Sequence, residues 1–174
     1  MPLVAPDDGE IAFISGSSTT KLTTDDCSPN LVQYVYDANG IANVVGKAII
    51  QNGGDSWFFI TVDYAFGLSL EAETTKVINA ANGKVIGSVK HPLTASDFSS
   101  AILQAQASGA KVIALANAGI DMINAIKAAK EFAIGPEQNV VSLISSITDI
   151  SSLGLDNANQ RARSRSCCDG FSRP

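Results

Sequence analysis

The fold is decided by the stretch Ser56-Trp57-Phe58-Phe59-Ile60-Thr61-Val62-Asp63-Tyr64-Ala65-Phe66-Gly67. Its first half is an unbroken apolar and β-branched run that is too short for a helix, which is typical of a strand covered on both faces. Polar and aromatic residues follow, and a helical pattern begins after Gly67. A loop between such a strand and a helix lies at the carboxyl edge of a parallel sheet, where open α/β folds bind ligands. The sequence therefore predicts a binding site at this loop.

Strands and helices alternate along the rest of the chain. Short apolar and β-branched runs predict further strands at 11–14, 31–36, 84–89, 111–116 and 139–144. Apolar residues at helical spacing predict helices that begin at Asp37, after Gly67, at Ser96 or Asp97, and near Met122. Short connections join these segments. We therefore predict an α/β fold, a doubly wound parallel sheet in three αβα layers with right-handed crossovers.

Composition and charge exclude several classes of protein. The chain has 174 residues, 45% of them hydrophobic and 17% charged, which is typical of a globular domain with a real core. Its net charge of -5 argues against a nucleic-acid partner, because binding to phosphates requires clustered Lys and Arg. No apolar run is long enough to cross a bilayer, and residues 1–8 have neither the basic start nor the apolar core of a signal peptide. We expect no direct membrane insertion and no export signal in this chain.

Sequence motifs for metal, cofactor or nucleophilic chemistry are missing. The three cysteines are Cys27 and the adjacent pair Cys167 and Cys168, a spacing that fits no zinc motif. His91 is the single histidine, and no local pattern pairs it with a cysteine. Neither a dinucleotide-binding glycine motif nor a phosphate-binding loop occurs. We therefore expect no cofactor, no metal site and no enzymatic activity.

The end of the chain, residues 157–174, differs from the rest. All four arginines lie there, whereas the preceding residues carry only lysine as a basic residue. The segment has no periodicity and almost no large apolar residue, which predicts disorder. We interpret it as an unrelated basic tail, from a shifted reading frame or a cloning remnant, rather than as an arm that binds nucleic acid.

Five segments occur along the chain in a characteristic order: Cys27-Ser28-Pro29-Asn30, Gly53-Gly54-Asp55-Ser56-Trp57-Phe58-Phe59, Asp63-Tyr64-Ala65-Phe66-Gly67, Asp97-Phe98-Ser99-Ser100 and Ala110-Lys111-Val112-Ile113-Ala114-Leu115-Ala116-Asn117. With these segments the chain resembles the type I periplasmic binding proteins. More narrowly, it is similar to the substrate-binding components of branched-chain amino acid type ABC transporters. The likeness covers roughly residues 10–156, and several segments in order are more specific than one motif.

The resemblance implies a domain organisation and a function. In that family two α/β lobes close on a small ligand, such as an amino acid or a carboxylate, and present it to an ABC permease in the periplasm. By this likeness, residues 1–36 correspond to the end of the first lobe and the crossover, and 37–156 to the second ligand-binding lobe. The resemblance thus implies a truncated receptor. We expect the strand at 11–14 to lack neighbours and to leave an apolar sheet edge that favours self-association.

The family's contact positions imply eight ligand-binding residues in this chain: Ser17, Ser18, Tyr64, Phe66, Asn117, Ala118, Asp121 and Ser145. Hydroxyls in the loop with Ser17 and Ser18 suit a ligand carboxylate, and the two aromatic residues suit an apolar wall. Asp121 or Asp63 suits an ammonium group. Because Ala118 stands where relatives place an aromatic residue, aromatic acids, amides and other small carboxylates stay open as ligands beside leucine-like amino acids.

Other interpretations stay open at this point. The loop with Ser17 and Ser18 is also typical of a linker, Tyr64 and Phe66 also fit packing under the helix, and Asp63 also fits a helix cap. A cytoplasmic ligand sensor on the same fold is one alternative function. A flavodoxin-like phosphoacceptor domain using Asp63 is another, although the earlier strand end lacks the acidic pair that would bind magnesium.

Overall fold

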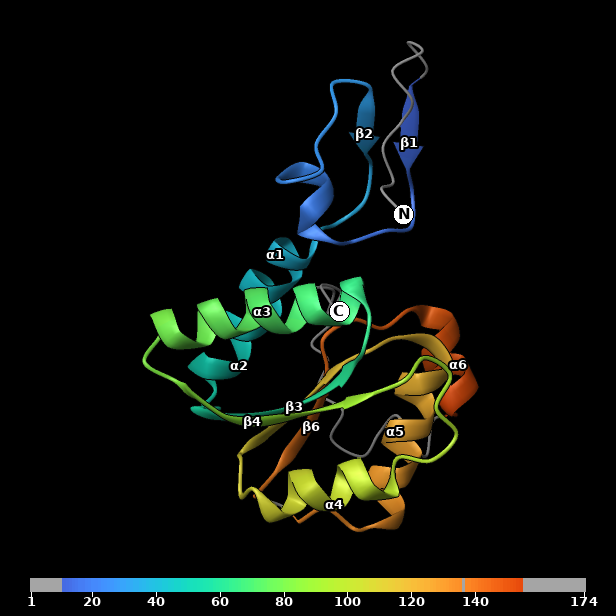
Figure 1. Cartoon of the computed structure of the whole chain (residues 1–174). Coiled ribbons are helices and arrows are strands. Elements are labelled where there is room, and N and C mark those ends of the chain that lie inside the picture. Colours follow the sequence, from blue (N-terminus) through green and yellow to red (C-terminus); the bar gives the residue numbers. More distant parts are fainter. Residues whose placement is uncertain (1–10, 136, 155–174) are drawn as a thin grey trace, which may run out of the picture.

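The computed structural model describes residues 11–135 and 137–154, and the predicted tail at 157–174 lies outside them. The strands are β1 (Ala12–Ile14), β2 (Leu31–Gln33), β3 (Ser56–Val62), β4 (Lys84–His91), β5 (Val112–Ala116) and β6 (Asn139–Ser142). The helices are η1 (Thr20–Thr23), α1 (Ala38–Ile41), η2 (Ala42–Gly46), α2 (Lys47–Gln51), α3 (Ala65–Ala80), α4 (Ser99–Ala107), α5 (Gly119–Glu131) and α6 (Ile147–Leu153). Figure 1 shows their arrangement.

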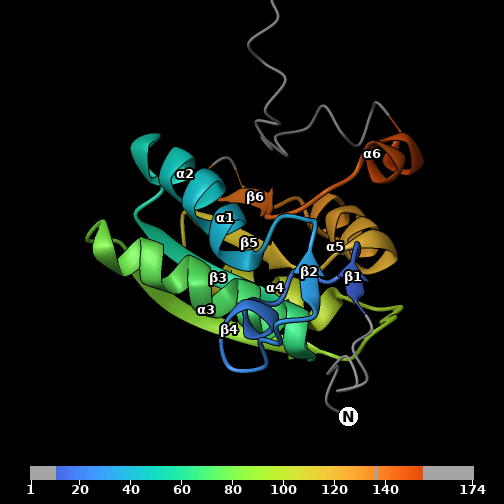
Figure 2. The same cartoon turned by 90° about the horizontal axis from the view of Figure 1, so that it is seen from above.

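Four strands form one parallel sheet in the order β4-β3-β5-β6, with β3 inside it. Helices α1, α2 and α3 cover one face, and α4 and α5 cover the other (Figures 1 and 2). This arrangement confirms the predicted doubly wound α/β fold. The chain runs from β3 outward to β4 and then crosses back to β5 on the other side of β3. The boundary between β3 and β5 is therefore the point where the winding direction changes.

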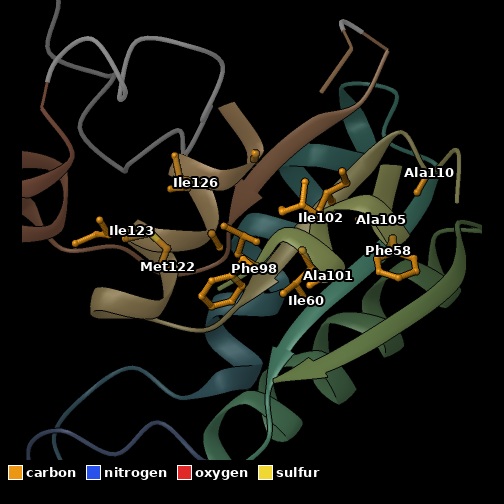
Figure 3. Packing of buried hydrophobic residues seen from close by; sticks show 14 of the residues in the cluster. Phe58, Ile60, Phe98, Ala101, Ile102, Ala105, Ala110, Met122, Ile123 and Ile126 are labelled. Atoms are coloured by element: carbon orange, nitrogen blue, oxygen red, sulfur yellow. The ribbon is translucent and has the colours of Figure 1, made fainter. Parts of the chain in front are cut away.

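Side chains of β3 alternate between two hydrophobic clusters, one on each face of the sheet. Trp57 and Phe59 pack with α3, and the indole Nε1 of Trp57 donates a hydrogen bond to the Gly54 carbonyl at 2.8 Å. Phe58 and Ile60 pack on the opposite face with residues of α4 and α5. Figure 3 shows Ile60 in that second cluster. Each large side chain buried in this way contributes about 1.5–3 kcal/mol to folding.

The strands β1 and β2 form a separate parallel pair, with Phe13 opposite Val32 (Figure 1). Phe13 and Val32 are exposed, with 70% and 41% of their surface accessible, whereas Ile14 and Leu31 are half-buried. The predicted strand at 31–36 is shorter than expected and ends at Gln33. A hydroxyl pair between Thr20 and Ser69, at 3.0 Å, connects this part of the chain to α3.

The helices follow the predicted pattern, with some differences. Helix α4 begins at Ser99, with Phe98 as its N-cap residue, rather than at Ser96 or Asp97. Asp37 caps the predicted helix by accepting a hydrogen bond from the Gly40 amide at 2.7 Å, but a π-helical turn, η2, interrupts that helix. Helix α6 is an element that the sequence analysis does not predict. A reciprocal capping box between Ser146 and Asp149 begins this helix, and such a box is recognisable from sequence.

Candidate ligand-binding site

The loops after β3 and β5 separate at the carboxyl edge of the sheet, because α3 and α5 cover opposite faces. In doubly wound folds this is where ligands bind. Five side chains at this edge come from the ends of three neighbouring strands and the starts of two helices. We call them the rim: Tyr64, Phe66, His91, Asn117 and Asp121.

Tyr64 and Phe66 form the aromatic part of the rim. Tyr64 is the N-cap residue of α3, with extended backbone, and 44% of its surface is exposed. The centroids of the two rings are 5.9 Å apart, and Phe66 also packs against the cluster beneath α3. Gly67 lets α3 approach the strand ends closely, because a Cβ atom there would lie 2.9 Å from the Ala116 carbonyl oxygen. Tyr64 is thus held at the edge with its ring accessible.

Asp121 lies in the first turn of α5 and is 3% exposed. Its Oδ2 accepts a hydrogen bond from the Thr94 amide at 3.1 Å, whereas its Oδ1 is buried without a partner. Burial, together with the negative charge of Asp121, raises the pKa of the Tyr64 hydroxyl above its ordinary value of 10.0. The charge of Asp121 therefore acts on the Tyr64 hydroxyl across the boundary between β3 and β5.

Thr94 holds an unusual backbone conformation where it meets Asp121. Its φ is 59°, in the left-handed region that a β-branched residue rarely adopts. Strained residues of this kind gather at functional sites, where the surrounding structure holds them in place. The strain in this loop is therefore a second feature of the edge that the sequence did not reveal.

His91 and Asn117 form a buried polar pair, 6% and 0% exposed. The ring Nε2 lies 3.0 Å from the amide nitrogen of Asn117, and Nδ1 lies 2.9 Å from the Pro92 carbonyl oxygen. The amide oxygen of Asn117 is buried without a partner. In the sequence, His91 follows a predicted strand, but it belongs to no motif and no cysteine is placed to pair with it, so the pattern does not indicate a place in the site.

Four predicted site residues lie outside the rim. Ala118 is exposed at the N-cap of α5, and Ser145 is half-buried after β6. Ser17 and Ser18 lie between β1 and η1, outside the four-stranded sheet. The buried Ser18 carbonyl accepts a hydrogen bond from the Ala38 amide at 2.8 Å. The order of the strands therefore brings Tyr64, Phe66, Asn117 and Asp121 to one edge of the sheet. Ligand binding by any of the eight residues stays a prediction.

Asp63 is exposed and lies 4.0 Å from the ammonium of Lys90. It does not cap α3, whose N-cap residue is Tyr64 and which has no side-chain cap. Within residues 11–135 and 137–154, no group of three His, Cys, Asp or Glu side chains is placed to hold a metal ion. In the same part of the chain, no helix has the length and apolarity to cross a membrane.

Comparisons with known proteins agree with this geometry. The family described as "Periplasmic binding protein" matches residues 4–161. A periplasmic binding protein from Burkholderia mallei is 48% identical, with a TM-score of 0.82 over 84% of this chain and 39% of that one. A branched chain amino acid ABC transporter periplasmic ligand-binding protein from Burkholderia xenovorans is 32% identical, with a TM-score of 0.75 over 85% of this chain and 40% of that one.

A solute binding protein of an ABC transporter from R. palustris, solved with benzoate, shares the fold at 18% identity, with a TM-score of 0.77 over 86% of this chain and 41% of that one. No curated protein matches the chain. The doubly wound α/β fold, with the rim at the carboxyl edge of its sheet, is shared with these solved structures. The chain belongs to the type I periplasmic binding protein family of branched-chain amino acid type ABC transporters. It spans about 40% of the length of these solved relatives.

Proposed function

We propose that this chain belongs to the solute-binding component of an ABC importer, which captures a small amino acid-like or carboxylate ligand between two lobes. The observation that carries the proposal is the pair of buried acceptors without partners at the rim, Asn117 Oδ1 and Asp121 Oδ1. Buried polar atoms in folded proteins almost always have a partner, so each unpaired one requires an explanation. A ligand seated at the rim supplies those partners.

The aromatic side chains supply the rest of a ligand site. The exposed ring of Tyr64 and the half-buried ring of Phe66 form an apolar surface beside the two acceptors. Small-ligand sites typically combine such a surface with a few placed polar groups. Ser17 and Ser18, from the part assigned to the first lobe, would meet the ligand carboxylate, and Ser145 and Ala118 would border the ligand.

The remaining elements of the function come from the family. A component of this kind delivers its ligand to an ABC permease from the periplasm, and it performs no chemistry on the ligand. Membership of the family supports transport over the two alternatives, a cytoplasmic sensor and a phosphoacceptor. Asp63 is exposed, and within residues 11–135 and 137–154 no group of three His, Cys, Asp or Glu side chains is placed to hold a metal ion, so the phosphoacceptor gains no further support.

Calorimetric titration of the full-length protein against amino acids and aromatic acids tests the proposal. We expect one class of ligand to bind and Tyr64→Ala to weaken that binding about tenfold or more, because truncation removes a large aromatic contact. Leu103→Ala is the matched control, since it removes an exposed apolar side chain from α4 on the other side of the sheet. Absence of binding across the whole panel would contradict the proposal.

A further inference from the structure

We infer that His91 is a positioning residue whose protonation reverses the side-chain amide of Asn117, which replaces a free hydrogen-bond acceptor at the rim by a donor. The inference rests on the proposed function and adds a control by pH to the same site. It starts from the two hydrogen bonds of the His91 ring, one at each nitrogen atom.

The backbone fixes which nitrogen of the neutral His91 ring carries the hydrogen. The carbonyl oxygen of Pro92 only accepts hydrogen bonds, so Nδ1, which lies 2.9 Å from it, is the donor. Nε2 is then an acceptor, and the amide nitrogen of Asn117, 3.0 Å away, donates to it. The amide oxygen is therefore the end of Asn117 that stays free, and it is buried without a partner.

Protonation of the ring removes the acceptor on which this arrangement depends. Both nitrogens of a charged histidine are donors, so an N–H group at Nε2 would face the N–H groups of Asn117. Turning the amide over resolves the conflict, because its oxygen then accepts from Nε2 and the bond from Nδ1 to Pro92 is kept. The amide nitrogen takes the place of the oxygen, and the free acceptor becomes a free donor.

The amide turns more easily than the ring. His91 is 6% exposed, its ring packs edge-on against Phe98 with centroids 4.7 Å apart, and its backbone carbonyl accepts from the Asp63 amide at 2.8 Å. The oxygen of Asn117 has no hydrogen bond to lose when it moves. Turning the amide therefore preserves every hydrogen bond of the histidine, whereas turning the ring would break the bond to Pro92.

The charged groups around the ring have other partners or lie elsewhere. Within residues 11–135 and 137–154, no ion pair includes His91, and the hydrogen bonds of its ring go to Pro92 and Asn117. Three carboxylates on the segments around the end of β4 have partners of their own: Asp63 with Lys90, Asp97 with the Ser99 amide, and Asp121 with the Thr94 amide. Helix α4 carries no charged residue, and α3, with Glu71, Glu73 and Lys76, covers the other face of the sheet.

The switch gives ligand affinity a dependence on pH whose sign follows from the ligand. A ligand that donates to the free oxygen of Asn117 binds the neutral form of His91, so ligand and proton compete. Its affinity then falls as the pH drops through the titration of His91, by at most about tenfold for each pH unit. A ligand with acceptors alone meets a donor and a positive charge in the acid form, and it is not weakened there.

Nuclear magnetic resonance tests the switch without a ligand. His91 is the single histidine of the chain, so a sample without a histidine tag has one imidazole signal. At about pH 8 we expect the nitrogen shifts of a ring with its hydrogen on Nδ1. On acidification to about pH 5, the side-chain amide signals of Asn117 should move with the same midpoint as the ring. The exposed amide of Asn52, which donates to the Ala48 carbonyl, is the internal control and should not follow that midpoint.

Calorimetric titration of the full-length protein with leucine and benzoate, at about pH 8 and about pH 5.5, tests the effect on binding. Leucine carries donors, and we expect it to bind about tenfold more weakly at the lower pH, whereas benzoate should bind no more weakly. His91→Gln offers a carbonyl oxygen to the Asn117 amide but does not titrate, so it should remove the pH dependence. Ser88→Ala, at an exposed position of β4, should keep it. Circular dichroism establishes that both variants are folded, and the resonance experiment needs neither.

The outcomes separate the inference from the proposed function. A hydrogen on Nε2 at about pH 8, a ring still neutral at about pH 5, or Asn117 signals that do not follow the ring overturns the inference and leaves solute capture in place. A pH dependence of binding that survives in His91→Gln also overturns it. If no ligand binds at either pH, the proposed function is wrong, and the resonance experiment still decides the switch. A common midpoint, with a pH dependence that His91→Gln removes, supports the inference.

Discussion

Gly67 is the position where the packing of α3 against the sheet leaves no room for a side chain. A Cβ atom there would lie 2.7 Å from Cγ1 of Val62 and 2.9 Å from the carbonyl oxygen of Ala116, and closer still to the carbonyl oxygen of Val62. Two of these atoms belong to the backbone of buried strands and cannot rotate away. We therefore expect Gly67→Ala to push the first turn of α3 away from β3 and β5.

Two opposing effects set the magnitude of this change. Alanine is favoured over glycine in a helix by about 1 kcal/mol, whereas overpacking a filled site costs about 1–3 kcal/mol. Because the contacts are with backbone atoms, we place the cost at the upper end. The free energy of unfolding should then fall by about 2 kcal/mol, which lowers the melting temperature by about 4–8 °C for a domain of this size.

Urea and thermal unfolding followed by far-ultraviolet circular dichroism measure this change. Gly46→Ala is the matched control, because Gly46 is also a buried helical glycine but its Cβ atom would meet a movable methyl of Val77 at 3.3 Å. We expect the control to change the free energy of unfolding by about 1 kcal/mol or less. If Gly67→Ala is as stable as the wild type, or if both variants behave alike, the close approach of α3 to the strand ends is refuted.

Three further predictions concern the rim and the helices behind it. Removing the charge in Asp121→Asn should lower the pKa of Tyr64 toward its ordinary value of 10.0, as measured by ultraviolet absorbance against Tyr64→Phe. The Lys76 ammonium lowers the pKa of Glu73 below its ordinary 4.5; this stabilisation is present above the unfolded-state pKa and is lost as the pH falls through the folded-state pKa. Glu73→Gln should therefore flatten the fall in melting temperature below about pH 4.5. Thr94→Gly should preserve or raise the free energy of unfolding, by up to about 1 kcal/mol, because glycine adopts a positive φ without strain.

Each of these three predictions has a control within the same protein. The exposed side chains of Tyr34 and Tyr36 are also present in Tyr64→Phe, so subtracting the absorbance of that variant leaves the signal of Tyr64. Asp149→Asn should leave the response of Glu73 to acid unchanged, because Asp149 belongs to the capping box with Ser146 at the start of α6, whereas Glu73 bonds to Lys76 within α3. Ser88→Gly is the control for Thr94→Gly. It should lower the free energy of unfolding, because glycine weakens the interior of a strand. An unchanged Tyr64 titration in Asp121→Asn would mean that the two side chains are not electrostatically coupled.

Much of the site was predictable because the local spacing of apolar residues predicts the order of strands and helices. The buried run at β3 and the polar and aromatic residues after it placed Tyr64 and Phe66 at a sheet edge. Asn117 and Asp121, on the loop after the strand predicted at 111–116, were assigned to the site by the resemblance to the family. His91 and Thr94 were not found, because neither belongs to a motif and the significance of each depends on a partner far away in the chain.

By itself the sequence determined the type of each major element and the class of fold, since apolar spacing and turn residues act within a few positions of one another. Only the tertiary structure decided that β4 and β5 flank β3, which brings His91 and Asn117 together across 26 residues and Thr94 and Asp121 across 27. It also decided which end of an amide stays free and which backbone conformation Thr94 must hold. Hydrogen-bond partners and burial of this kind depend on how distant segments pack, and that packing leaves no local pattern in the sequence.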